Sequence, residues 1–117
     1  SLHAALPLYL IGDVSGRTAI IVDDMIDTAG TLTQAVDSLL RNGAKKVFAV
    51  ATHAVLSGPA ISRLTESGIE KVLVTDTIPL SAAAQACGKI EVISVAPLVA
   101  EAIRRIYGND SVSSLFN

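Results

Sequence analysis

The stretch that decides the fold is Ile20-Ile21-Val22-Asp23-Asp24-Met25-Ile26-Asp27-Thr28-Ala29-Gly30-Thr31-Leu32. It begins as an apolar run, which ends in two adjacent carboxylates. Four residues after Asp23 comes the loop formed by residues 27–31, and a helical pattern follows immediately. This order predicts a strand, a tight loop and a helix N-terminus, which is the geometry that holds a phosphate group on backbone N–H groups.

The rest of the chain alternates apolar runs with helical patterns. The runs that we interpret as strands cover residues 18–22, 47–51, 72–75 and 90–95. The helical patterns cover residues 32–40, stopped by Gly43, a short helix capped by Ser57 and ended by Gly68, and a last helix from Pro97 to Gly108. Strands that alternate with helices predict right-handed crossovers and a parallel sheet. We therefore expect an α/β fold in one domain over residues 1–117: a three-layer, doubly wound, mostly parallel sheet.

The side chains of the loop suit an anionic, hydroxylated ligand. Gly30 is expected to take a positive φ and to let the backbone approach the ligand closely. The hydroxyls of Thr28 and Thr31 add hydrogen-bond donors. Asp23 and Asp24 would repel a phosphate, but they suit the hydroxyls of a ribose or a nearby Mg²⁺. The alternative is that Asp24 and Thr28 cap the helix and that Asp23 is merely solvated.

Composition excludes several classes of protein. The net charge is −2 and the basic residues are scattered, so nothing predicts nucleic-acid binding. The apolar runs are short, so no transmembrane helix is expected. The single Cys87 fits a reducing compartment, which leads us to expect a cytoplasmic protein, and we interpret its side chain as a small apolar filler. Residues 1–8 have the character of a fragment start or a tag.

The loop resembles the 5-phosphoribosyl-1-pyrophosphate (PRPP) motif shared by type I phosphoribosyltransferases and ribose-phosphate pyrophosphokinases, also called PRPP synthetases. Further blocks resemble the second group, and the match runs from about Tyr9 to the C-terminus. These blocks are residues 51–60, 74–79, 100–106 and 111–116. The resemblance implies the C-terminal, ribose 5-phosphate-binding half of a two-domain enzyme with the type I phosphoribosyltransferase-like fold.

This resemblance also implies a reaction and a binding site. In the family, pyrophosphate passes from ATP to ribose 5-phosphate, giving PRPP and AMP for nucleotide biosynthesis, and Mg²⁺ accompanies the ATP. Asp23 and Asp24 would face the ribose hydroxyls. The residues that would bind the 5-phosphate are Asp27, Thr28, Ala29, Gly30 and Thr31.

Other implied features concern the whole enzyme. Ser111, Ser113 and Phe116 match a tail that helps to form a regulatory phosphate/ADP site between subunits. The family assembles as hexamers. Its N-terminal domain, with most of the ATP site, and its basic catalytic loop have no counterpart in this chain. We therefore assign no catalytic residue and no metal ligand here, and expect this chain alone to be inactive.

Two other functions fit parts of the pattern. One is a non-catalytic subunit that joins and regulates a PRPP synthetase, which a degenerate phosphate loop would favour. The other is a type I phosphoribosyltransferase, which needs a base-recognising hood for which no segment has room. We interpret His53 as a structural or subunit-contact residue and Asp76 as a loop cap or turn residue. Arg104 and Arg105 are interpreted as a solvated or interface face of the last helix.

Overall fold

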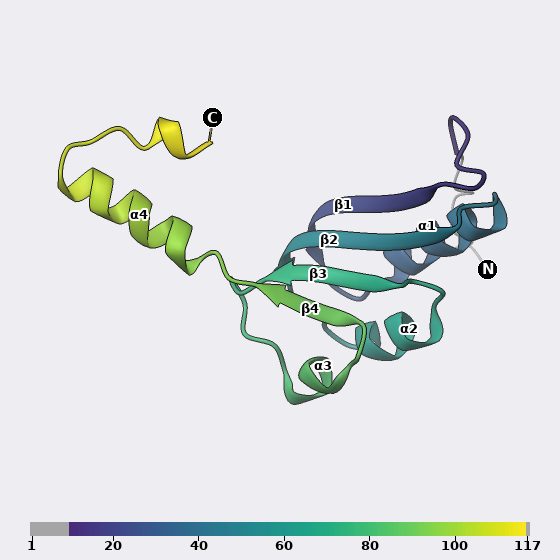
Figure 1. Cartoon of the computed structure of the whole chain (residues 1–117). Helices are drawn as coiled ribbons and strands as arrows, with labels where there is room; N and C mark the ends of the chain where they lie inside the picture. Colours follow the sequence, from purple (N-terminus) through teal and green to yellow (C-terminus); the bar gives the residue numbers. More distant parts are fainter. Residues whose placement is uncertain (1–9, 117) are drawn as a thin grey trace, which may run out of the picture.

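The computed structural model describes residues 10–116, so the predicted origin of residues 1–8 lies outside the described residues (Figure 1). In chain order, the elements are β1 (Thr18–Ile26), α1 (Gly30–Arg41), β2 (Lys46–Ala54), α2 (Ala60–Glu66), β3 (Lys71–Thr75), α3 (Ala82–Ala86), β4 (Ile90–Ile93), α4 (Ala96–Tyr107) and the 3₁₀ turn η1 (Ser113–Phe116).

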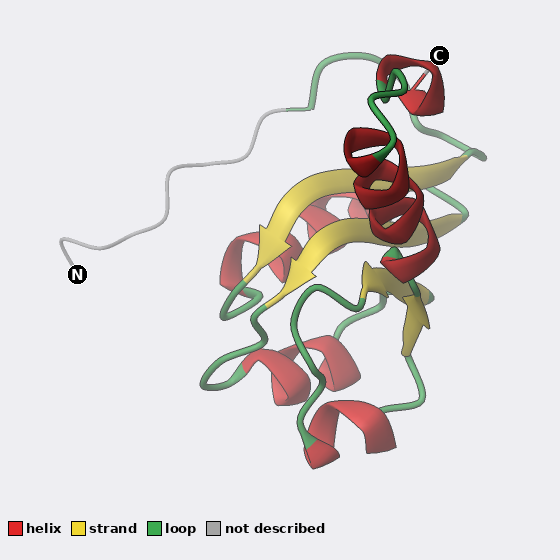
Figure 2. Ribbon diagram, turned by 90° about the vertical axis from the view of Figure 1, so that its left-hand side faces the viewer, coloured by secondary structure: helices red, strands yellow, loops and turns green. Residues whose placement is uncertain are grey.

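The four strands form a parallel sheet in the order β1-β2-β3-β4. Every crossover runs in the same direction, and right-handed crossovers of this kind place the connecting helices on one face of the sheet. Accordingly, α1, α2 and α3 lie together on one side of the sheet (Figures 1 and 2). The α/β class and the parallel sheet are confirmed. The second helical layer that we expected on the opposite face is not formed by residues 10–116.

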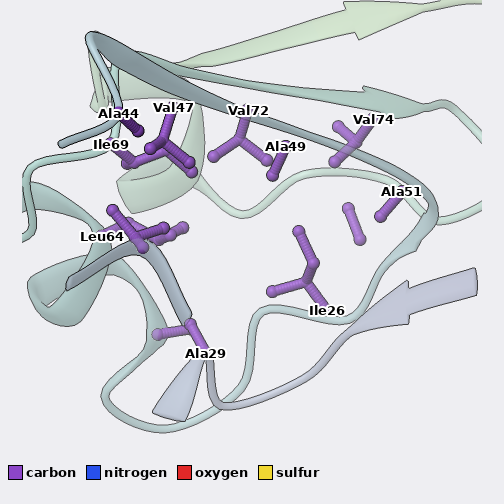
Figure 3. Packing of buried hydrophobic residues seen from close by; sticks show 13 residues of the cluster. Ile26, Ala29, Ala44, Val47, Ala49, Ala51, Leu64, Ile69, Val72 and Val74 are labelled. Carbon is purple, nitrogen blue, oxygen red and sulfur yellow. The ribbon is translucent and has the colours of Figure 1, made fainter. Parts of the chain in front are cut away.

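The core lies between the sheet and these helices. Val47, Ala49, Val72 and Val74 alternate with outward-facing residues along the two central strands, and all are almost fully buried. Leu64 of α2 packs opposite them (Figure 3). Burial of these side chains fixes α2 against the sheet, next to the loop that follows β1.

The opposite face of the sheet carries apolar side chains without cover. Val22 is 77% exposed and Val50, its register partner on β2, is 38% exposed. Helix α4 leads away from the sheet (Figure 1) and has no buried residue. By helical spacing, its exposed residues Val99, Ile103 and Ile106 share one face. Neither α4 nor another helix within residues 10–116 is long and apolar enough to cross a membrane.

Candidate functional site: a pocket at the start of α1

A pocket of about 290 Å³ opens where β1 ends and α1 begins. It contains most of the residues that the sequence predicted for the site. Asp24 is the exception, because it is not part of the lining. Three apolar residues that the sequence reasoning did not assign, Met25, Ile26 and Leu32, also line the pocket; their position beside the loop was the only available signal. The lining residues are Asp23, Met25, Ile26, Asp27, Thr28, Ala29, Gly30, Thr31 and Leu32.

The backbone turn into the helix occurs at Ala29. Ala29 is the N-cap of α1, with a left-handed backbone conformation (φ 63°, ψ 14°), and no side chain caps this helix. The alternative in which Asp24 and Thr28 cap the helix is therefore wrong. So is the expectation that Gly30 takes the positive φ, since Gly30 is already the first residue of the helix.

The first N–H groups of α1 point out of the helix without partners. A helix offers no intrahelical acceptor to these groups. Within residues 10–116, the first backbone N–H recorded as bonded at this end is that of Thr33, which donates to Ala29 O at 3.0 Å. The N–H groups of Gly30, Thr31 and Leu32 are thus free for a ligand. They also carry the positive end of the helix dipole, which favours an anion.

The two adjacent carboxylates are oriented by their own backbone. Oδ1 of Asp23 accepts a hydrogen bond from Asp24 N at 2.8 Å, and Oδ1 of Asp24 accepts one from Met25 N, also at 2.8 Å. Both side chains are exposed, and each retains its second oxygen as an acceptor. Asp23 thereby presents a fixed carboxylate at the edge of the pocket.

The loop after β2 braces the pocket from the side. Ser57 does not cap α2, whose N-cap is Pro59. Instead, its N–H donates to Asp27 O at 3.0 Å and its hydroxyl donates to the carboxylate of Asp27. Asp27 is thus tied to a segment 30 residues further along the chain.

The remaining polar residues form contacts outside the pocket. His53 Nδ1 lies 2.7 Å from the hydroxyl of Thr77. Asp76 accepts hydrogen bonds from the hydroxyl of Ser94 at 2.5 Å and from the N–H of Val95 at 2.9 Å. The hydrogen bond from Ser94 lowers the pKa of Asp76 most, and the bond from Val95 lowers it further. Both residues therefore make hydrogen bonds between segments at the ends of strands.

The C-terminal tail also lies outside the pocket lining. The hydroxyls of Ser111 and Ser113 are 2.8 Å apart, and Phe116 is 70% exposed. Arg105 donates to Ser111 O at 3.2 Å and also contacts Glu101.

Glu101 on α4 accepts hydrogen bonds from two arginines. The bonds from Arg104, together with a smaller contribution from Arg105, lower its pKa to about 2. Within residues 10–116, no group of three or more His, Cys, Asp or Glu side chains is arranged to hold a metal ion.

Several known proteins are similar to this chain over nearly its whole length. The chain is 59% identical over 115 residues to a ribose-phosphate pyrophosphokinase of Chromobacterium violaceum, covering 98% of this chain and 35% of that protein. It is 61% identical over 114 residues to a protein of the same name from Caldanaerobacter subterraneus subsp. tengcongensis, covering 97% and 36%. The chain thus spans about a third of the length of these curated relatives.

A solved structure of a protein with a related name is also similar to this chain. The chain aligns with a crystal structure of phosphoribosylpyrophosphate synthetase from Mycobacterium smegmatis at a TM-score of 0.81 and 47% identity, covering 85% of this chain and 33% of that one. The chain therefore has the type I phosphoribosyltransferase-like α/β fold. The family model described as "Phosphoribosyl synthetase-associated domain" matches residues 3–117, and the chain belongs to that family.

Proposed function

We propose that this chain is the C-terminal, ribose 5-phosphate-binding domain of a ribose-phosphate pyrophosphokinase of the cytoplasm. The whole enzyme would transfer pyrophosphate from ATP to ribose 5-phosphate, giving PRPP and AMP. The observation that carries the proposal is the pocket in which the unpaired N–H groups at the start of α1 meet an acidic strand end. The names of the relatives supply the substrate class.

The pocket separates the two ends of the proposed substrate by charge. The 5-phosphate carries a charge near −2 and would accept hydrogen bonds from the N–H groups of residues 29–32, with Thr28 and Thr31 adding their hydroxyls. The ribose hydroxyls would donate to the carboxylate of Asp23 at the other side of the loop. A phosphate could not lie against Asp23, so this distribution of charge orients the sugar.

Asp23 and Asp24 also fit a supporting role for Mg²⁺. Hard cations prefer carboxylate oxygens, and Mg²⁺ commonly takes only one or two from a protein and completes its shell with water and substrate phosphates. Each carboxylate here keeps a free oxygen at the strand end. In the whole enzyme, the ion would neutralise charge on the transferring phosphates.

We expect the remainder of the enzyme to cover the uncovered surfaces of this chain. Exposed apolar side chains lie at Val22 and Val50 on the sheet and along one face of α4. Such side chains favour burial, and a missing N-terminal domain and subunit partners would cover them. Ser111, Ser113 and Phe116 would contribute to a regulatory site only in such an oligomer, which in the family is a hexamer. We therefore expect the isolated chain to form no AMP from ATP and ribose 5-phosphate.

Isothermal titration calorimetry of the 117-residue chain tests the binding site. Ribose 5-phosphate should bind more tightly than ribose, and inorganic phosphate should compete with it. Thr31→Val, which removes a hydroxyl from the pocket, should weaken ribose 5-phosphate about three- to tenfold, the effect of one hydrogen bond.

Thr65→Val is the matched control, because the hydroxyl of Thr65 donates to Ile61 O within α2. Its affinity for ribose 5-phosphate should equal that of the wild type. Equal losses from both threonine variants, or equal affinities for ribose and ribose 5-phosphate, would contradict the proposal.

A further inference from the structure

Arg63 of α2 reaches across to the pocket loop. Its Nη1 donates a hydrogen bond to the backbone carbonyl of Thr28 at 3.1 Å, although the two residues are 35 positions apart. The same guanidinium lies against Gly30, where an added Cβ would come within 3.0 Å of Nη1. A side chain at residue 30 would therefore crowd the guanidinium, which would have to shift by a few tenths of an ångström.

The contact fixes the direction of a peptide group. In a trans peptide, the C=O of one residue and the N–H of the next point in opposite directions. The carbonyl of Thr28 points to Arg63, which is not part of the pocket lining, so the N–H of Ala29 points the other way. A carbonyl turned into the pocket would instead present a negative dipole to an anion.

The two residues before Thr28 are held by backbone hydrogen bonds from the loop that follows β2. Leu56 N donates to Ile26 O and Ser57 N donates to Asp27 O, each at 3.0 Å. With Arg63 on Thr28, three consecutive carbonyls of the loop, at residues 26–28, are held by the β2–α2 segment. The next residue, Ala29, has a left-handed backbone conformation (φ 63°), and such a conformation persists only where its surroundings impose it.

We propose that Arg63 is a positioning residue of this pocket, which turns the Thr28–Ala29 peptide so that its N–H faces a bound phosphate. The inference rests on the proposed function, since it assigns the anion of ribose 5-phosphate to the pocket. Arg63 does not touch the phosphate: it acts through the loop backbone, and its positive charge behind the loop favours the same anion.

The test compares Arg63→Met with Arg63→Lys in the 117-residue chain. Methionine keeps much of the apolar stem and loses the donor, so the dissociation constant for ribose 5-phosphate should rise about three- to tenfold. Lysine keeps a donor and a charge and should recover most of the affinity. Arg41→Met, on the exposed end of α1 where Arg41 pairs with Asp37, is the control and should bind as the wild type does.

Two readouts separate positioning from stability and from simple charge. The carbonyl ¹³C shift of Thr28 in the ligand-free chain should change in Arg63→Met and return towards the wild-type value in Arg63→Lys. The difference in affinity between Arg63→Met and the wild type should persist in 0.5 M KCl. At this salt concentration, interactions between exposed charges are screened within about 4 Å, so a purely Coulombic effect would largely disappear. A merely structural residue would lower the thermal midpoint without changing the affinity of the folded chain.

The possible results are distinct. If the wild type binds ribose 5-phosphate and Arg63→Met binds it equally well, or if the Thr28 shift is unchanged, the inference is wrong and the proposed function stands. If the affinity difference disappears in high salt, Arg63 acts by charge alone and its positioning role is refuted. If the wild type binds neither ribose 5-phosphate nor phosphate, the proposed function fails and takes the inference with it.

Discussion

Lys89 holds the end of the helix that carries Arg63, so replacing it should destabilise the domain measurably. Its Nζ donates to the carbonyls of Leu64 and Thr65 at 3.1 Å and of Ser67 at 2.8 Å. Helix α2 has only 7 residues, too few to be stable by itself. A cation at a helix C-terminus contributes about 0.3–1 kcal/mol and a typical hydrogen bond a net of about 0.5–1.5 kcal/mol, so Lys89→Met should lower the free energy of unfolding by about 1–2 kcal/mol.

Urea unfolding, followed by circular dichroism, measures this loss. Lys46→Met, at an exposed position at the start of β2, is the matched control and should change the free energy of unfolding by less than about 0.5 kcal/mol. Because α2 presents Arg63 to the loop, Lys89→Met should also weaken binding of ribose 5-phosphate. A loss no larger than that of Lys46→Met would refute the argument that Lys89 secures α2.

Two further predictions concern a titration and a packing contact. The carboxyl of Glu101 should titrate by NMR with a pKa of about 2, below its ordinary 4.5. Because the pKa is lowered, the pairing of Glu101 with Arg104 stabilises the folded chain above about pH 4.5, and this stabilisation is lost as the pH falls through 2. Arg104→Ala should raise the pKa of Glu101, and an unchanged pKa would exclude the pairing in solution. Gly68→Ala places a Cβ 2.4 Å from Leu40 Cδ1 and should lower the free energy of unfolding in urea by about 1 kcal/mol. Gly88→Ala is the control and should leave this free energy nearly unchanged, because no atom lies within 4 Å of the added Cβ. Equal losses in the two variants would exclude steric crowding as the cause.

Strand positions follow from the apolar runs, but their ends do not. The sequence predicted a strand over residues 18–22, whereas β1 extends to Ile26. Aspartate is depleted in strands, so a pattern-based reading stops at Asp23. In the structure, Asp23 and Asp24 each bond the next backbone N–H, which accommodates both carboxylates within the strand. The last strand is shorter than predicted, since β4 ends at Ile93.

The pocket loop was predictable in position and only partly in conformation. Residues 27–31 were assigned from the sequence, and all of them line the pocket. The positive φ falls on Ala29 and not on Gly30, which instead lies against the guanidinium of Arg63, 33 residues further along the chain. No local pattern contains that information. The direction of α4 was likewise unpredictable, because an amphipathic helix pattern does not say which surface covers it.

The role of the pocket as a ribose 5-phosphate site is tested most directly by an NMR titration of the chain with ribose 5-phosphate and PRPP, with and without Mg²⁺, following backbone amide shifts. We predict shifts concentrated at residues 23–32, largest at the N–H groups of residues 29–32. Shifts centred on another part of the chain, or no shift at millimolar ligand, would contradict it.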